Sequence, residues 1–288
     1  MRHAEDLERI AAALAEARRA LAAFTPGEVE ARTKQGDDPV TAADTLVDTI
    51  LKRLLPRPGE GWLSEETQDD GARLACRRVW VVDPLDGTRE FVQGLPEWSV
   101  SVALVEDGTP VAGGICNPAT GETFLGAQGH GVTLNGAPVR VSARPTLIAP
   151  AGAAGDSLAS AGAGLAAGRT ATTGTAATIL ASRTEVHRGQ WAHWDAVPGG
   201  APFHIIPMGS VAYKLARVAA GLADATWTLV PKHEWDVAAG IALIHAAGGR
   251  TQAGTPEEER FNRPHPLLSR LIAAPPQLMP EITALLGC

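Results

Sequence analysis

The sequence predicts a mixed fold of helices and β-sheets in two tightly joined halves. The first half reads as helices followed by mostly antiparallel strands, and the second half alternates strand with helix. A chain of 288 residues is also long enough for two subdomains. We place residues 1–145 in an N-terminal α+β half and residues 146–288 in a C-terminal α/β half.

The N-terminal half is expected to begin with two amphipathic helices. Apolar residues recur at helical spacing through the first 24 residues. A second helix is predicted at about residues 42–55, with an apolar face made of Leu46, Ile50, Leu51 and Leu54. Strands are then predicted at residues 79–82, 98–105, 111–116, 122–127 and 132–141.

The C-terminal half begins with residues 142–177, which are rich in Ala, Gly and Thr and poor in charge. We interpret this stretch as the crossover between the halves and assign no element to it. After it, strands are predicted at residues 179–182, 204–206, 225–229 and 271–274, and helices at residues 186–194, 211–220 and 236–247.

Charge and composition narrow the function. A formal net charge of −7 argues against a nucleic-acid polymer as partner, because such binders carry a basic face. No apolar run approaches the roughly 20 residues that span a bilayer, and the charged opening is not a secretory signal. Three cysteines without CxxC spacing indicate a reducing compartment. We therefore expect a cytoplasmic protein without a membrane partner.

The segment at residues 83–88 carries the most chemical information. A buried apolar strand ends at Asp83, Pro84 interrupts further pairing, and Asp86 follows three residues later. Two acids so close repel each other unless a cation lies between them, and Mg²⁺ prefers such oxygen ligands. If Gly87 and Thr88 open a helix, their amides form an anion site beside the metal. Each dipeptide alone is equally typical of an ordinary turn.

Three further segments contain candidate acids, each with a simpler alternative. Glu65, followed by a second glutamate, could lie in a solvated loop. Asp236 stands near the start of a helix whose first turn holds small residues, and it could be an N-cap. Thr41 and Asp44, at the start of the second helix, could form a capping box.

Together, these segments resemble the inositol monophosphatase superfamily of magnesium-dependent, lithium-sensitive phosphatases. The matching segments are PVTAAD (39–44), SEE (64–66), DPLDGT (83–88) and WDVAAG (235–240), supported by LGAQGHGVTLNG (125–136) and GSVAYKLARVAAG (209–221). Only residues 142–177 match poorly. The resemblance implies a layered αβαβα sandwich, a homodimer, and hydrolysis of a small phosphorylated substrate.

The resemblance also implies a role for each matching residue. Two or three Mg²⁺ ions are expected, the first held by Glu65, Asp83 and the Leu85 carbonyl, the second by Asp83, Asp86 and Asp236. Asp44 and Thr88, with the metal-bound Glu65, would activate the attacking water. Substrate-binding roles fall on Gly87, Thr88, Arg183, Gly209, Ser210 and Lys232.

The expected substrate is a 3′(2′),5′-bisphosphate nucleotide such as adenosine 3′,5′-bisphosphate, hydrolysed to AMP. Leu229 occupies the position at which inositol-specific members carry an acid, and Arg89-Glu90 and Ser182-Arg183 are similar to the bisphosphate nucleotidases. Arg183 and Lys232 could then bind the second phosphate. The alternative is that Arg89 and Arg183 are solvated or form structural ion pairs.

Other functions remain open at this stage. Inositol-1-monophosphatase, fructose-1,6-bisphosphatase and histidinol-phosphatase belong to the same superfamily. A non-catalytic binding protein could also retain the fold, since fold alone does not fix function. The presence of Glu65, Asp83, Asp86 and Asp236 favours an enzyme.

Overall fold

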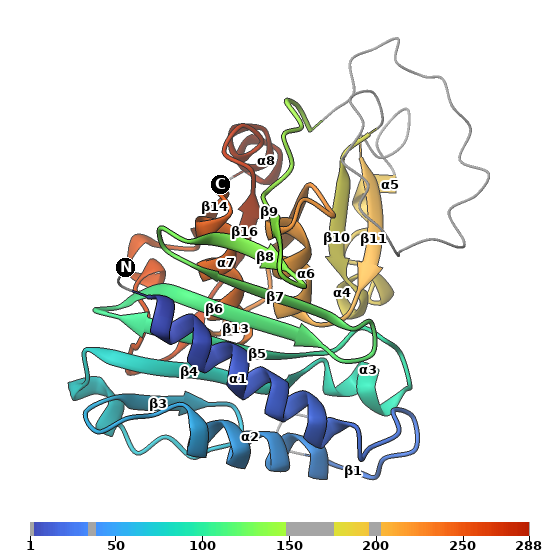
Figure 1. Ribbon diagram of the computed structural model, residues 1–288. Helices are drawn as coiled ribbons and strands as arrows, with labels where there is room; N and C mark the ends of the chain where they lie inside the picture. The colour runs from blue at the N-terminus through green and yellow to red at the C-terminus, as the bar shows by residue number, and fades with distance from the viewer. Residues whose placement is uncertain (1–2, 34–38, 148–175, 196–202, 288) are drawn as a thin grey trace.

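Two β-sheets alternate with three layers of helices, as Figure 1 shows for the computed structural model. The structure describes residues 3–33, 39–147, 176–195 and 203–287. This αβαβα arrangement is the fold that the sequence predicted. Within the described residues, no helix combines the length and apolar character needed to cross a membrane.

The first sheet has seven strands in the order in which they occur along the chain. All neighbours are antiparallel except the parallel first pair. Its strands are β3 (Gly61–Ser64), β4 (Arg78–Asp86), β5 (Ser99–Glu106), β6 (Thr109–Asn117), β7 (Glu122–Ala127), β8 (Gly131–Leu134) and β9 (Ala137–Val139). Most predicted strands are confirmed. The strand expected at residues 132–141 is instead a hairpin, because Asn135 and Gly136 both have positive φ and turn the chain.

Helices α1 (Ala4–Leu21) and α2 (Ala42–Leu54) cover the outer face of this sheet (Figure 1). The predicted apolar face of α2 is wrong for two of its four residues, while Leu51 is buried and Ile50 is half-buried. Leu46 and Leu54 are exposed, whereas Ala43 and Val47 are buried. The buried face also carries Asp44 and Asp48, so the helix is rotated to hold acids against the sheet. A short hairpin of β1 (Ala31–Thr33) and β2 (Pro39–Thr41) precedes α2.

Helices α6 (Val211–Ala219) and α7 (Glu234–Ala246) form the central layer between the two sheets. Small residues allow this layer to pack closely. A Cβ on Gly240 would lie 2.4 Å from the Cβ of Leu215, and one on Gly113 would lie 2.6 Å from the carbonyl oxygen of Ala239. The core around α6 and α7 contains residues of both predicted halves, and the boundary at residue 145 stays a prediction.

The second sheet has the strand order β11-β10-β12-β16-β14. The first three strands are parallel, and β16 is antiparallel to β12 and β14. Its outer face packs against the C-terminal helix α8. The bounds are β10 (Thr178–Ser182), β11 (His204–Met208), β12 (Ala225–Thr228), β14 (Arg250–Ala253), β16 (Leu271–Ala274) and α8 (Met279–Leu286). Four strands and the helices α6 and α7 of this half were predicted, whereas β14 and α8 were not.

The remaining elements are short. They are α3 (Thr88–Val92), α4 (Arg183–His187), α5 (Ala192–Asp195), β13 (Lys232–His233), β15 (Leu267–Leu268) and the 3₁₀ turns Ala72–Ala75 and Pro256–Glu259. The single helix predicted at residues 186–194 is wrong, because Gly189 adopts a φ of 72° and separates α4 from α5. Most of the 142–177 stretch, residues 148–175, lies outside the described residues.

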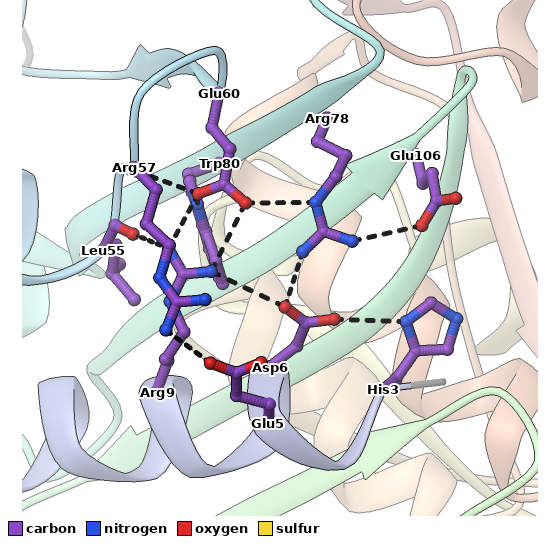
Figure 2. Close-up of polar contacts among 10 residues, drawn as sticks. All are labelled: His3, Glu5, Asp6, Arg9, Leu55, Arg57, Glu60, Arg78, Trp80 and Glu106. Atoms are coloured by element: carbon purple, nitrogen blue, oxygen red, sulfur yellow. Dashed lines mark hydrogen bonds and ion pairs between the residues drawn. The ribbon is translucent and has the colours of Figure 1, made fainter. Parts of the chain in front are cut away.

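A network of charged side chains ties α1 to the edge of the first sheet (Figure 2). Glu60 is at its centre: Arg9 Nη2 donates to Glu60 at 2.7 Å, Arg78 Nε at 3.0 Å and the Trp80 indole at 2.8 Å. The Arg78 guanidinium also bonds Asp6 at 2.5 Å. Burial alone would raise the pKa of Glu60, but these hydrogen bonds lower the pKa to about 2.

The first prediction concerns acid stability. Since the pKa of Glu60 falls from 4.5 to about 2 on folding, its stabilisation is complete above pH 4.5 and is lost as the pH falls toward 2. Glu60→Gln should lower the free energy of unfolding at pH 7 by about 2–3 kcal/mol, because Arg9 and Arg78 each lose one of their carboxylate partners in a largely buried network. It should also flatten the loss between pH 4.5 and 2. Urea unfolding monitored by circular dichroism measures both effects.

The matched control is Glu16→Gln, which removes the carboxylate of an exposed ion pair with Arg19. Its effect should stay within about 0.5 kcal/mol. An equal effect of the two substitutions would contradict the importance of the buried network.

Candidate active site

A cavity of about 410 Å³ opens where the end of β4 faces the start of α6 and α7. It brings together segments that lie far apart in the sequence. Nearly all the predicted site residues line it: Glu65, Asp83, Leu85, Asp86, Gly87, Thr88, Arg183, Gly209, Ser210, Lys232 and Asp236. Asp44 is not among the lining residues. Its carboxylate instead accepts a hydrogen bond from Thr88, which lines the cavity.

A β-bulge turns two aspartates toward the same side of the first sheet. Asp83 lies opposite Ser101 on β5, and Asp86 lies opposite Ser99, with a register shift between them. Residues three apart on a regular strand face opposite sides, whereas Ser99 and Ser101 share one side. The irregularity therefore gives both aspartates the same side. Pro84, which has no N–H to pair, falls within it.

The four acids repel one another across the cavity. Burial raises the pKa of Asp83 well above its usual range, and Glu65, Asp86 and Asp236 raise it further. Burial likewise raises the pKa of Asp236 to about 8, with Asp86 and Glu65 adding to the effect. Such a set of hard oxygen donors, buried and short of positive charge, fits a divalent cation of the Mg²⁺ type.

The match between this site and a divalent cation rests on the type of donor atoms and on their negative charge. Within the described ranges, no three His, Cys, Asp or Glu side chains already form a group that could hold a metal ion.

Asp86 is held by the start of α6. One of its oxygens accepts hydrogen bonds from Ser210 Oγ and from the Ala212 amide, both at 2.6 Å. Burial raises the pKa of Asp86, while these bonds lower it. Ser210 adopts a φ of 52°, which is uncommon for a residue with a side chain, and Ser99 contacts its hydroxyl at 3.1 Å. The Ser210 hydroxyl and the Ala212 amide thus orient an acid of the site.

Asp44 serves both as a helix cap and as a partner of Thr88. Its Oδ2 accepts from the amide and hydroxyl of Thr41 at 2.8 and 2.6 Å, which completes the capping box at α2. Its Oδ1 lies 3.0 Å from the Thr88 hydroxyl, which is also 2.9 Å from the Leu85 carbonyl oxygen. The hydroxyl has one proton, so it can donate to only one of these acceptors at a time.

The turn after β4 requires glycine. Gly87 has a φ of 96°, and a Cβ there would lie 2.8 Å from the Glu97 carbonyl oxygen. Helix α3 has Gly87 as its N-cap and begins at Thr88, so these two residues do open a helix, and the amides of this turn start it beside the acids. Gly209 is similarly constrained, because a Cβ there would lie 2.4 Å from the Glu90 carboxyl carbon.

The loop that carries Glu65 is held by Asp48, which the sequence analysis missed. Ser64 Oγ donates to Asp48 at 2.5 Å, and Thr67 Oγ1 donates to it at 2.7 Å. Asp48 is one helical turn after Asp44 on α2, and that spacing was the available signal.

Asp236 lies in the first turn of α7. The helix begins at Glu234, two residues before the predicted start. The N-cap is His233 and not Asp236, so the N-cap alternative for Asp236 is wrong. Asp236 is the third residue of the helix, and its Oδ2 accepts from the His233 amide at 2.8 Å. Its cavity position and its raised pKa show that it also belongs to the acidic cluster.

Part of the cavity wall is cationic. Arg183 Nε donates to Glu97 Oε2 at 3.1 Å, which is the structural ion pair considered as an alternative. That oxygen also accepts from the Gly209 amide at 2.8 Å. Lys232 Nζ lies 3.4 Å from the Pro231 carbonyl oxygen, and Arg89 and Arg188 also line the wall.

Lys214 on α6 was not selected from the sequence, although it lies within a segment that matched the superfamily. It is buried and lines the same cavity. Burial lowers the pKa of Lys214 to about 8, while the negative charge of Asp86 counters part of that effect.

Comparison with known proteins agrees with this geometry. The model of the inositol monophosphatase family matches residues 3–287. An inositol-1-monophosphatase from Rhizobium meliloti is 35% identical over 219 residues, which cover 74% of this chain and 71% of that protein. The solved suppressor protein SuhB of Bartonella henselae aligns with a TM-score of 0.74 at 26% identity over 98% of both chains.

CysQ of Bacteroides thetaiotaomicron, another solved member of this family, aligns with a TM-score of 0.66 at 25% identity over 94% of this chain and 97% of that one. Phosphatases of the family generally depend on a metal ion. The match over nearly the whole length, together with the shared fold, shows that this chain belongs to the inositol monophosphatase family of phosphatases.

Proposed function

We propose that this phosphatase hydrolyses a small phosphate monoester with Mg²⁺ held by Glu65, Asp83, Asp86, Asp236 and the Leu85 carbonyl. The observation that carries the proposal is the gathering of four mutually repelling acids beside the start of α3. Bound Mg²⁺ would neutralise phosphate charge and lower the pKa of a water molecule. Two or three ions are expected from the resemblance to the family.

The protein groups supply orientation and proton transfer. Thr88 donates its proton to Asp44 and turns a lone pair toward the cavity, where it can accept a hydrogen bond from the attacking water. Asp44 keeps Thr88 in this orientation because its other oxygen is fixed by the α2 cap. The amides of Gly87 and Thr88 face the phosphate in this proposal.

For the substrate, we favour a nucleotide with a second phosphate, such as adenosine 3′,5′-bisphosphate. Its support is the cationic part of the cavity wall, where Arg183 and Lys232 lie, and the exposed Leu229 at the expected position of a polyol-binding acid. A second anionic group would be attracted to that wall. The likeness to CysQ is in keeping with this choice.

A second candidate is inositol 1-phosphate. One reason is that the relative at 35% identity is an inositol-1-monophosphatase. The other is that Arg183, one of the proposed phosphate ligands, is already paired with Glu97.

The second prediction tests the metal ligands. Asp83→Asn should reduce Mg²⁺-dependent phosphate release by about 100-fold or more, because the central charged ligand is lost. Without metal it should be the more stable protein, since one repelling charge is gone. A gain of about 1 kcal/mol corresponds to a rise in Tm of roughly 2–4 °C. Asp107→Asn, which changes an exposed ion pair with Arg77, should alter neither quantity. Near-normal activity of Asp83→Asn would contradict the assignment.

The third prediction tests the water-orienting pair. Thr88→Ala keeps the backbone amide but removes the hydroxyl that bonds Asp44. We expect kcat to fall by about 100-fold with little change in KM, as for a group that acts in the transition state. Steady-state kinetics on the best substrate measure both. A raised KM with normal kcat would show instead that Thr88 only binds substrate.

The fourth prediction tests the substrate class. Phosphate release should be fastest from adenosine 3′,5′-bisphosphate in a panel with inositol 1-phosphate, fructose 1,6-bisphosphate and histidinol phosphate. Arg183→Ala and Lys232→Ala should each lower kcat/KM for the bisphosphate about 10- to 100-fold more than for adenosine 3′-monophosphate. Lys52→Ala, on the exposed face of α2, is the control. A preference for inositol 1-phosphate would reject the nucleotide and support the second candidate.

A further inference from the structure

Glu234 is the first residue of α7, two positions before Asp236, and its side chain is fully buried. A carboxylate loses its hydration in such a position, which is unfavourable unless the protein supplies hydrogen-bond donors. The donors come from another segment: Glu234 Oε2 accepts from the Asn262 amide at 2.8 Å, and Oε1 accepts from the Arg263 amide at 3.2 Å. The Arg263 guanidinium adds an ion pair at 3.4 Å. Glu234 therefore binds the start of α7 to residues 262–263.

Arg73 bonds the same two residues from the side of the first sheet. It lies in the 3₁₀ turn Ala72–Ala75, with 2% of its surface exposed. Its guanidinium donates to Asn262 Oδ1 at 2.7 Å and to the Arg263 carbonyl oxygen at 3.0 Å. In return, the side-chain amide of Asn262 donates to the Arg73 carbonyl oxygen at 3.1 Å. Residues 262–263 are thus held between Glu234 and Arg73.

The guanidinium of Arg73 also holds the loop that carries Glu65. Its Nε and Nη2 both donate to Asp69 Oδ2, at 3.0 and 2.7 Å. Asp69 follows Glu65 by four residues, and between them Thr67 is bonded to Asp48. Within the part of the chain that the structure describes, four of the five guanidinium N–H groups donate to protein acceptors. The Glu65 loop is therefore linked to the start of α7 through buried hydrogen bonds.

This chain of contacts joins two segments whose acids repel each other. Glu65 and Asp236 lie near enough for the negative charge of one to oppose ionisation of the other. The repulsion is greatest when no cation lies between them, and it favours movement of the loop away from α7. Hydrogen bonds to charged groups are stronger than neutral ones, so the contacts of Arg73 and Glu234 oppose that movement.

We propose that Glu234 and Arg73 are positioning residues for the metal site. Together they hold the Glu65 loop and the start of α7 at the separation at which Glu65 and Asp236 can ligate neighbouring divalent cations. The inference rests on the proposed metal site and adds residues that touch neither metal nor substrate. Ligands that are already in place lose less conformational freedom when a cation binds. Loss of these contacts should therefore weaken metal binding more than it slows the reaction of the metal-loaded enzyme.

The test measures binding of Mn²⁺ to the metal-free protein by electron paramagnetic resonance, which detects the free ion. In Glu234→Gln, the Kd of Mn²⁺ should rise about 10-fold or more, the lower end of the range for residues that support metal ligands. The new side chain has nearly the same size but turns N–H donors toward the backbone amides. At saturating Mg²⁺, kcat should stay within about threefold of that of the unsubstituted enzyme.

Asn262→Gly is a second variant, which breaks only the link to Arg73. Asn262 has a φ of 61°, a conformation that glycine adopts readily, and the backbone amide that bonds Glu234 is retained. The Kd of Mn²⁺ should rise about fivefold or more, as for the loss of one hydrogen bond. Thermal unfolding checks that both variants fold. If Glu234→Gln does not fold, Asn262→Gly decides the matter alone.

Glu258→Gln is the matched control. Glu258 accepts from the Gly254 and Ser269 amides, both at 3.0 Å, so it also bonds two separate segments, but it does not line the cavity. Its substitution should leave the Kd of Mn²⁺ unchanged. A lower Tm with unchanged Mn²⁺ affinity in the folded variants at Glu234 and Asn262 would show a purely structural contact and overturn the positioning role. If Asp83→Asn binds Mn²⁺ as tightly as the unsubstituted protein, the proposed metal site itself is wrong, and the positioning role fails with it.

Discussion

Electrostatic repulsion among four acids that line one cavity is the constraint around which this molecule is organised. The four acids come from three separate segments: Glu65, Asp83 with Asp86, and Asp236. The negative charge of one carboxylate makes ionisation of its neighbours less favourable. A protein optimised only for stability would not gather them. The fold opposes the repulsion locally, through the start of α6 at Asp86 and the His233 amide at Asp236. A bound cation can offset the electrostatic repulsion that remains among the four carboxylates.

The supporting structure places each acid by a different local device. The bulge in β4 gives Asp83 and Asp86 a common side of the sheet. The rotation of α2 brings Asp44 to Thr88 and Asp48 to the loop of Glu65, at the expense of exposing Leu46 and Leu54. The charged network around Glu60 lies at the edge of the same sheet and secures α1 against it (Figure 2). Stability and site geometry are thus supplied by different parts of the N-terminal half.

Much of the fold and the site could be predicted from the sequence. Strong apolar strands such as β4 and β6 have a clear pattern, and the motif around Asp83 combines several signals in six residues. The face of α2 could not be predicted from hydrophobicity, because tertiary contacts bury two aspartates in preference to two leucines. Strand β14 has polar residues and short length, so its pairing with β16 depends on a partner far along the chain.

The roles of individual charged residues needed the structure. Arg183 and Lys214 are both cations near the cavity, yet one is paired with Glu97 and the other is buried and donates to a backbone carbonyl oxygen. Arg183 and Lys214 differ in their burial and in their hydrogen-bond partners, and neither property can be read from the amino-acid sequence. Homodimer formation and cytoplasmic location, both expected from the sequence, stay predictions.

The most direct measurement of the central claim is an anomalous diffraction map from crystals grown with Mn²⁺, which prefers the same oxygen ligands as Mg²⁺. We predict at least two Mn²⁺ peaks within about 2.5 Å of carboxylate oxygens. Asp83 should ligate both ions, Glu65 one of them and Asp236 the other. A map with no peak in contact with Asp83, at Mn²⁺ concentrations that support activity, would contradict the claim that these acids form the metal site.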